Sequence, residues 1–114
     1  MAVDELKSKD VDFVLLHCNS SYPCQYEEVA LPVIKRLMDE FQCLVGYSGH
    51  EIGIYPAIAS ICYGACVVEK HFTLDKNMPG SDHSISLTPD EMKELVKGIR
   101  SIEKSVMIKE KKSI

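Results

Sequence analysis

The chain has 114 residues, with 46% hydrophobic residues, 26% charged residues and a formal net charge of −4 at pH 7. The acidic balance argues against a general nucleic-acid-binding surface, and the sequence contains no run of about 18 apolar residues that could cross a membrane. A chain of this length suffices for one small domain.

The cysteine pattern and the N-terminal sequence indicate a reducing, cytoplasmic environment. The five cysteines are odd in number and contain no C-x-x-C motif, which disfavours both a disulfide framework and a zinc knuckle. For most of them we expect reduced thiols that pack as small apolar groups. The N-terminal sequence MAVDELKSKD is charged and lacks the apolar segment of a signal peptide. The basic run 109–112 is interpreted as a solvated end of the chain.

The first half of the chain predicts two strands with one helix between them. The continuous apolar run 13–16 is typical of a strand that is buried on both faces. Apolar residues recur at helical spacing over 27–41, and Pro32 indicates that the regular helix begins near that residue. Residues 44–47 form the second predicted strand, and 48–50 form its exit loop.

The second half of the chain adds a helix, a strand, a long loop and a final helix. Pro56 fits the first turn of a short apolar helix that Gly64 ends, and residues 66–69 form the third predicted strand. The loop 74–86 is long for a compact chain, so a functional role is expected. Thr88 is followed by Pro and, three positions on, by Glu, a pattern that predicts a capped helix start.

This order of strands and helices predicts parallel strands joined by right-handed crossovers. The exits of parallel strands lie at the same edge of a sheet, where α/β folds place their sites. His50 follows the second strand and His71 the third, so we expect the two imidazoles to lie close together. Two imidazoles suit a divalent metal ion and leave coordination positions for substrate oxygen. Without a third protein ligand, the alternative of two satisfied polar residues at strand ends stays open.

Three further polar residues at the strand exits are candidates for chemistry. Ser20 and Ser48 are expected in exit loops, where their hydroxyls either donate to a phosphate or carboxylate or cap their own loops. Glu69 lies two residues before His71, so strand alternation places both on the same face. There it would orient a metal ligand or relay a proton, or it would pair with Lys70 or solvent instead.

Three segments, LLHCNSSYP, GYSGH and CVVEKHFTLDKNMPGSDH, resemble in this order those of the sialic acid synthases, and the resemblance covers residues 11–100. The catalytic domain of that family is a TIM barrel, and the match falls on its last three β/α units. Because a complete barrel needs roughly 200 residues, the resemblance implies an α/β fold that is a partial (β/α)₈ TIM barrel of about three parallel units. Residues 1–114 would be a single partial domain, the C-terminal portion of that barrel, without the family's C-terminal antifreeze-like domain.

The resemblance also implies an activity and a set of site residues. The family condenses phosphoenolpyruvate with an N-acetylated sugar aldehyde, such as N-acetylmannosamine, to give a nonulosonic acid and phosphate. A divalent ion, Mn²⁺ or Mg²⁺, polarises the aldehyde. Without the resemblance, Asp82 would be interpreted as a turn residue. Our candidate catalytic residue is Glu69, and the roles carried over are metal binding by His50 and His71, phosphoenolpyruvate binding by Ser20 and Ser48, and sugar binding by Tyr22 and Asp82.

The sequence departs from the family pattern in two respects. Gly49 stands directly before the first metal histidine, where the family usually has Asp, so the site is weakened if that Asp supports the histidine or the metal. The family's catalytic glutamate and phosphate-binding lysines come from earlier strands, and Lys70 is not a substitute for them.

We therefore expect either a homo-oligomer or a complementing polypeptide that carries the missing barrel strands. Neither a nucleic-acid partner nor a membrane partner is expected. The alternative is an inactive truncated or split-gene fragment that only binds ligands or oligomerises.

Overall fold

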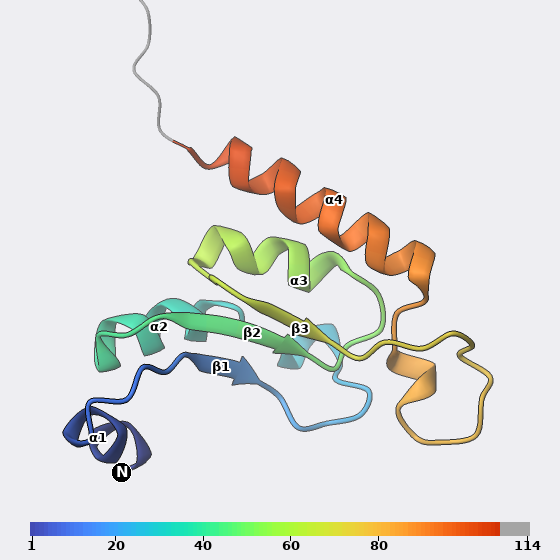
Figure 1. The fold of residues 1–114 in the computed structure, drawn as a ribbon. Helices are drawn as coiled ribbons and strands as arrows, with labels where there is room; N and C mark the ends of the chain where they lie inside the picture. Colours follow the sequence, from blue (N-terminus) through green and yellow to red (C-terminus); the bar gives the residue numbers. More distant parts are fainter. Residues whose placement is uncertain (108–114) are drawn as a thin grey trace, which may run out of the picture.

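A computed structural model describes residues 1–107 as a three-stranded parallel sheet with helices packed against it (Figure 1). The basic run 109–112 lies outside the described residues. The strand arrowheads point to the same end of the sheet, where the loop after β3 lies. The elements in chain order are α1 Ala2–Ser8, β1 Leu15–Cys18, η1 Tyr26–Glu28, α2 Pro32–Phe41, β2 Val45–Gly49, α3 Tyr55–Ala59, η2 Ser60–Tyr63, β3 Val68–Lys70, η3 His83–Ile85 and α4 Pro89–Ser105.

The strands follow one another in the order β1-β2-β3, so β2 is the central strand. Ser48 is the register partner of Cys18 on β1 and of Glu69 on β3, and Gly49 is the partner of Lys70. All pairs are parallel, which confirms the predicted α/β fold with three parallel strands.

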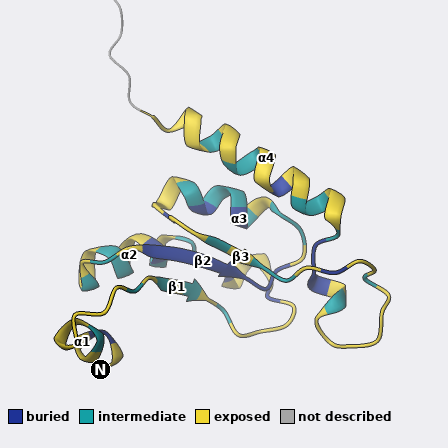
Figure 2. Ribbon diagram, viewed as in Figure 1, coloured by how far each residue is buried: buried dark blue, intermediate teal, exposed yellow. Residues whose placement is uncertain are grey.

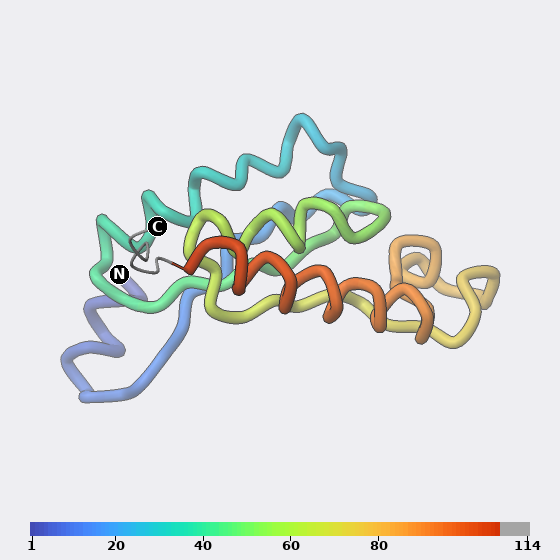
Figure 3. The backbone as a smooth tube through the Cα atoms, turned by 90° about the horizontal axis from the view of Figure 1, so that it is seen from above, coloured from blue at the N-terminus to red at the C-terminus, as the bar shows by residue number. Residues whose placement is uncertain are grey.

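One face of β2 builds the core together with the helices. Val45 and Tyr47 pack in one buried cluster with Ile34 of α2, Ala57 of α3 and Leu95 of α4. In Figure 2 the central strand is accordingly buried, whereas the helices are exposed on their outer sides. Seen from above, α2, α3 and α4 run along one direction as a layer of helices (Figure 3). Because side chains alternate along a strand, the residues between Val45 and Tyr47, and after Tyr47, point to the opposite face.

The predicted helix ends are confirmed. Helix α2 begins at Pro32, and Gly64 ends η2 in the left-handed region with φ +97°. A Cβ at Gly64 would also lie 2.8 Å from Sδ of Met38. The side chain of Thr88 accepts from the backbone N–H of Glu91, and the Glu91 side chain accepts from the N–H of Thr88, which completes the capping box of α4.

The prediction of a first strand buried on both faces is wrong. The strand begins at Leu15 rather than Phe13, and its residues alternate between half-buried and exposed. Leu16, which faces away from the helices, is 38% exposed. The physical reason is that β1 is an edge strand, and within residues 1–107 no layer covers that face of it.

The cysteines are all free, and they lie within the described residues. Cys24 is buried and Cys43 packs partly buried against the core, so packing as a small apolar group holds for these two residues and fails for Cys18, Cys62 and Cys66, which are exposed. Burial also raises the pKa of the Cys24 thiol. Among residues 1–107, no helix combines the length and the apolar character that a bilayer crossing requires.

Candidate active site

His50 and His71 lie side by side where β2 and β3 end. Their ring centroids are 5.3 Å apart, with the ring planes inclined by 54°. His50 is buried at 6% exposure, whereas the side chain of His71 is 37% exposed. The expected juxtaposition of the two histidines is therefore present in the fold, at an edge that is open on one side.

The imidazole of His50 is held in one tautomer. Its Nδ1 lies 2.6 Å from the carbonyl oxygen of Asn19, in the loop that follows β1. Because a carbonyl only accepts, Nδ1 carries the proton and Nε2 presents its lone pair. Sγ of Cys18 lies 3.6 Å from the same Nδ1. The loop after β1 thus fixes the ring of His50 with the Nε2 lone pair free.

Tyr22 and Asp82 lie against the two histidines. The ring of Tyr22 stacks on His50 at 4.1 Å and meets the edge of His71 at 6.1 Å. Oδ2 of Asp82 is 3.9 Å from Nδ1 of His71, which is too long for a hydrogen bond. Four residues that were selected from the sequence therefore lie together, and they come from three different loops.

Ser48 and Glu69 form a second pair on the same face of the sheet as the histidines. The hydroxyl of Ser48 donates to Oε1 of Glu69 at 2.8 Å. Ser48 lies inside β2 and is buried, rather than in an exit loop as expected, since β2 extends to Gly49. Within residues 1–107, Glu69 forms no ion pair with Lys70, which pairs with Glu51 instead. Ser20 lies exposed in the loop after β1, and within residues 1–107 its side chain forms no hydrogen bond.

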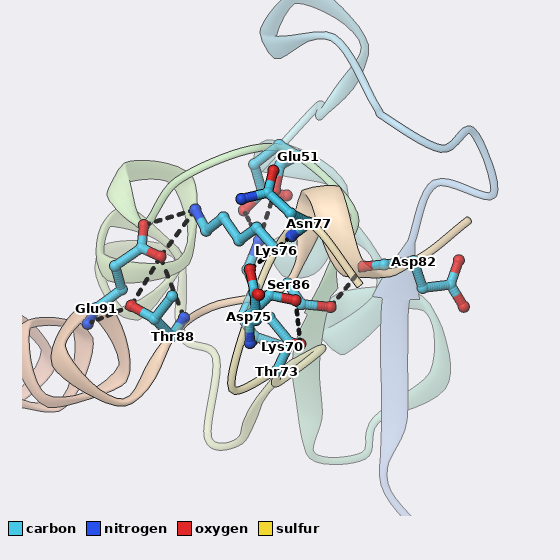
Figure 4. A network of polar contacts seen from close by, with 10 residues as sticks. All are labelled: Glu51, Lys70, Thr73, Asp75, Lys76, Asn77, Asp82, Ser86, Thr88 and Glu91. Carbon is cyan, nitrogen blue, oxygen red and sulfur yellow. Dashed lines mark hydrogen bonds and ion pairs between the residues drawn. The ribbon is translucent and has the colours of Figure 1, made fainter. Parts of the chain in front are cut away.

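A buried polar network on the opposite face of β2 was missed from the sequence. The side chains of Glu51 and Lys70 are 0% and 1% exposed, and Nζ of Lys70 lies 3.3 Å from Oε1 of Glu51 (Figure 4). The Lys70 ammonium also donates to the backbone oxygen of Glu51 at 2.7 Å, and the Tyr47 hydroxyl donates to Oε2 at 2.6 Å. An acid directly after one candidate ligand and a lysine directly before the other is the signal that could have revealed it.

Burial changes the acid–base behaviour of this network. Burial raises the pKa of Tyr47, and its hydrogen bond to Glu51 acts in the same direction. Burial lowers the pKa of Lys70, while the charge of Glu51 opposes that change. The Tyr47 hydroxyl therefore remains a proton donor to the Glu51 carboxylate at neutral pH.

Gly49 provides the space for the Glu51 carboxylate. A Cβ at Gly49 would lie 2.6 and 2.7 Å from the two carboxylate oxygens of Glu51, and 2.9 Å from Cε2 of Tyr47. Such distances are too short for any real Cβ, so glycine is required as long as Glu51 keeps its position. A carboxylate therefore lies beside Gly49 in this chain, and it belongs to residue 51.

The loop 74–86 is fastened at its base and along its length. The backbone N–H of Leu87 donates to the backbone oxygen of His71 at 2.8 Å, and the backbone N–H of Thr73 donates to the backbone oxygen of Leu87 at 2.9 Å. The Thr73 hydroxyl bonds Nδ1 of His83 at 2.8 Å, and the hydroxyl of Ser86 donates to the carbonyl of Asp82. Figure 4 shows the contact between Ser86 and Asp82, together with the Lys76–Glu91 pair that joins the loop to α4. The backbone of Asp82 is thereby held beside His71.

The donor set at this edge fits a metal only in part. Within residues 1–107, no group of three or more His, Cys, Asp or Glu side chains is arranged to hold a metal ion. His50 and His71 supply two imidazoles at 5.3 Å between centroids. Two neutral imidazoles suit a first-row transition ion that takes its remaining ligands from water or substrate oxygen.

Comparisons with known proteins agree on one family. The NeuB family matches residues 1–111. The chain is 52% identical over 99 residues to the N,N'-diacetyllegionaminic acid synthase of Legionella pneumophila subsp. pneumophila. That alignment covers 87% of this chain and 28% of the relative. The chain is 45% identical over 102 residues to the N-acetylneuraminate-9-phosphate synthase of Homo sapiens, covering 89% of this chain and 28% of that protein.

A solved structure shares the fold over almost the whole chain. The N-acetylneuraminic acid (sialic acid) synthetase from Leptospira borgpetersenii serovar Hardjo-bovis, in complex with citrate, matches with a TM-score of 0.91 at 34% identity. That match covers 99% of this chain and 40% of the other chain. The chain therefore spans well under half of the length of the proteins that it resembles, and 28% of the two curated relatives.

Proposed function

The chain belongs to the NeuB family, and we propose that it supplies one part of the active site of a sialic acid synthase-like enzyme. Residues 1–114 would then be a single partial domain, the last three β/α units of a (β/α)₈ TIM barrel. The support is the parallel three-stranded sheet, and the matched relatives that are named synthases of sialic or legionaminic acids. The free cysteines favour a reducing compartment such as the cytoplasm.

The proposed reaction joins phosphoenolpyruvate to an N-acetylated sugar aldehyde, such as N-acetylmannosamine. C3 of phosphoenolpyruvate forms a bond to the aldehyde carbon, water adds at C2, and phosphate leaves, which gives a nonulosonic acid. The names of the relatives support a product of this class, because they are synthases of N-acetylneuraminate 9-phosphate and of diacetyllegionaminic acid.

His50 and His71 are the proposed ligands of a divalent ion, Mn²⁺ or Mg²⁺. When bound, the ion would act as a Lewis acid on the carbonyl oxygen of the sugar. The single observation that carries the proposal is the pair of adjacent imidazoles, with Nδ1 of His50 fixed by Asn19 so that Nε2 is free to bind. Imidazole is a poorer ligand for Mg²⁺ than for a transition ion, which favours Mn²⁺.

The neighbouring polar residues would hold the two substrates. Ser20 and Ser48 are the proposed contacts of phosphoenolpyruvate, and Tyr22 and Asp82 those of the sugar. The ring centroid of Tyr22 lies 4.1 Å from that of His50, and Oδ2 of Asp82 lies 3.9 Å from Nδ1 of His71. A sugar aldehyde held at the metal would therefore be within reach of both side chains.

Glu69 is the proposed catalytic residue. Its carboxylate accepts a hydrogen bond from Ser48 and lies on the histidine face of the sheet, so it is placed to move a proton near the reacting carbons.

The remainder of the site would come from other polypeptide. β1 and β3 each pair with one neighbour within residues 1–107, so each has an edge free for another strand. Either further copies of this chain or a polypeptide that carries the first barrel strands would cover these edges. The alternative function is an inactive fragment that only binds ligands or oligomerises.

A complementation experiment tests the proposed function. The chain is mixed with a polypeptide carrying the first five barrel strands of a relative, and Mn²⁺, phosphoenolpyruvate and N-acetylmannosamine are supplied. Phosphate release coupled to nonulosonic acid formation is expected, and it should disappear with the His50→Ala/His71→Ala double variant. Failure of every complementing polypeptide would support the alternative function instead.

A further inference from the structure

The ion pair between Glu51 and Lys70 joins the two residues that adjoin the histidine pair. Glu51 directly follows His50 in the chain, and Lys70 directly precedes His71. Nζ of Lys70 reaches both the backbone oxygen of Glu51, at 2.7 Å, and its carboxylate, at 3.3 Å. Both side chains are withdrawn from solvent, at 0% and 1% exposure, so water does not compete for these bonds.

The sheet pairing ends just before the two histidines. The register between β2 and β3 ends at the pair Gly49 and Lys70, one residue before each histidine. Beyond that point, the backbone oxygen of His50 accepts from Cys24 and that of His71 accepts from Leu87. These two bonds tie each histidine to a different segment, and they do not tie the histidines to one another.

The Lys70 ammonium provides a second link between the two strand ends, beyond the last register pair. His50 is bracketed by Gly49, which is paired with β3 in the sheet, and by Glu51, whose backbone is bonded to the Lys70 side chain. The Glu51 carboxylate is in turn fixed by the hydroxyl of Tyr47 at 2.6 Å, so both of its oxygens are engaged. The result is a cross-strand connection on the helix side of the sheet, directly behind the imidazoles.

Stability alone does not account for this arrangement. A buried ion pair gains little net free energy over apolar side chains of similar volume, because both charges lose their hydration. Its hydrogen bonds do have fixed directions, and these directions set the position of the backbone on either side. We infer that Glu51 and Lys70 are positioning residues that set the separation and orientation of His50 and His71. The consequence for metal affinity rests on the proposed function, whereas the geometric effect does not.

The test compares two lysine variants of the full 114-residue chain. Lys70→Met removes the donors that reach Glu51 and keeps most of the length of the side chain. Lys76→Met is the matched control, since it removes a half-buried lysine of the loop after β3, which pairs with Glu91 at 2.8 Å but contacts neither histidine. The metal-free readout is the nuclear Overhauser effect between the ring protons of His50 and His71, and the second readout is Mn²⁺ affinity by calorimetry.

The parent chain and Lys76→Met should show the ring-to-ring effect, and Lys70→Met should lose it. If the parent binds Mn²⁺, Lys70→Met should bind about tenfold more weakly, the range found when groups that orient metal ligands are removed. A parent that shows the effect but binds no Mn²⁺ refutes the metal role in the proposed function, while loss of the effect in Lys70→Met still supports positioning.

A double variant separates the loss of histidine positioning from a general loss of stability. Lys70→Met leaves Glu51 as an unpaired buried charge and can destabilise the fold for that reason alone. Glu51→Gln/Lys70→Met removes both charges, so its melting temperature should return toward that of the parent while the ring-to-ring effect stays absent. A folded double variant that keeps both the effect and the parental Mn²⁺ affinity would overturn the inference.

Discussion

The carboxylate of Glu51 occupies the space into which a side chain at Gly49 would project. A Cβ there would lie 2.6 Å from one carboxylate oxygen and 2.7 Å from the other. The two positions therefore depend on each other: a side chain at 49 requires that Glu51 move, and Glu51 is held by Lys70 and Tyr47.

Replacing Gly49 should destabilise the fold even when the new side chain is small. For Gly49→Ala we expect a loss of about 1–3 kcal/mol in the free energy of unfolding, the usual cost of forcing extra atoms into a packed interior. Gly49→Asp should cost more, because it places a second carboxylate beside the first. Denaturant titration followed by circular dichroism measures both, and an unchanged midpoint for Gly49→Ala would contradict the geometry.

Moving the carboxylate from one position to the other should recover much of that loss. Lys70 is the register partner of Gly49, so a carboxylate at position 49 would face the same ammonium. We expect Gly49→Asp/Glu51→Ala to be more stable than the sum of its single variants predicts. A double-mutant cycle gives the coupling free energy, and strict additivity would show that the two positions do not share one space.

The order and type of the helices and strands could be predicted from local sequence, whereas the side-chain pairs and the layers that cover each face could not. Pro32, Gly64 and the Thr88 capping box act within one turn of the chain, so they predict helix ends reliably. The adjacency of His50 and His71 follows from the general rule that parallel strands end at one edge.

Other features depend on tertiary structure that the local pattern does not contain. The pairing of Lys70 with Glu51, rather than with Glu69, depends on the face to which each side chain points and on the strand register. The exposure of Leu16 depends on what covers β1, and the covering layer is not part of residues 1–107. A sequence pattern indicates a face that needs a partner, but it does not indicate which polypeptide supplies it.

Metal binding should depend on both histidines. His50→Ala and His71→Ala should each weaken Mn²⁺ binding by at least about tenfold, because each removes one of two imidazole ligands. Mg²⁺ should bind more weakly than Mn²⁺ to the parent chain, since imidazole is a poor ligand for Mg²⁺. Calorimetry gives both affinities.

His17→Ala is the control, because that ring bonds the backbone oxygen of Val29 at 2.7 Å and not the histidine pair. Parental affinity in the double alanine variant would exclude this site.

Acid should weaken the connection between the long loop and α4. Hydrogen bonding to Lys76 lowers the pKa of Glu91 below its ordinary value of 4.5, and the bonds from Thr88 act in the same direction against the effect of burial. A depressed pKa in the folded state means that Glu91 stabilises the fold above about pH 4.5, and that this contribution is lost as pH falls through the folded pKa.

Glu91→Gln isolates this effect, because Gln still completes the capping box but carries no charge. The parent should melt at a higher temperature than Glu91→Gln at pH 7, and the difference should close as the pH is lowered below about 4.5. Glu103→Gln, from the exposed pair with Arg100, should change little at either pH. A difference between the parent and Glu91→Gln that is independent of pH would contradict the assignment.

The isolated chain should associate with itself. Val14 beside β1 is 43% exposed, and Val67 before β3 is 48% exposed, so apolar side chains flank both free strand edges. Light scattering should therefore detect oligomers or aggregates. Val14→Lys should shift the population toward smaller species, whereas Val106→Lys, at the far end of α4, should not. A monodisperse parent monomer with a cooperative melting transition would show that the edges are not association sites.

The isolated chain should not catalyse the proposed reaction at a measurable rate. The chain offers the histidine pair, the hydroxyl of Ser48 and the carboxylate of Glu69, which can hold a metal and move a proton. The resemblance places the groups that neutralise the phosphate, and a further glutamate, on strands outside this chain. Loss of even one preorganised electrostatic group costs roughly 10²–10³-fold in rate, and here several are absent together.

With Mn²⁺, phosphoenolpyruvate and N-acetylmannosamine, the purified chain should therefore release no phosphate above the background rate. Once a complementing polypeptide restores turnover, Glu69→Gln should lower kcat with little change in KM, because the variant keeps the acceptor for Ser48 but cannot take up a proton. Ser48→Ala should instead raise the KM for phosphoenolpyruvate, since it removes a proposed binding group. Robust turnover by the chain alone would mean that residues 1–114 contain the whole of the chemistry, and that the role assigned to the missing strands is wrong.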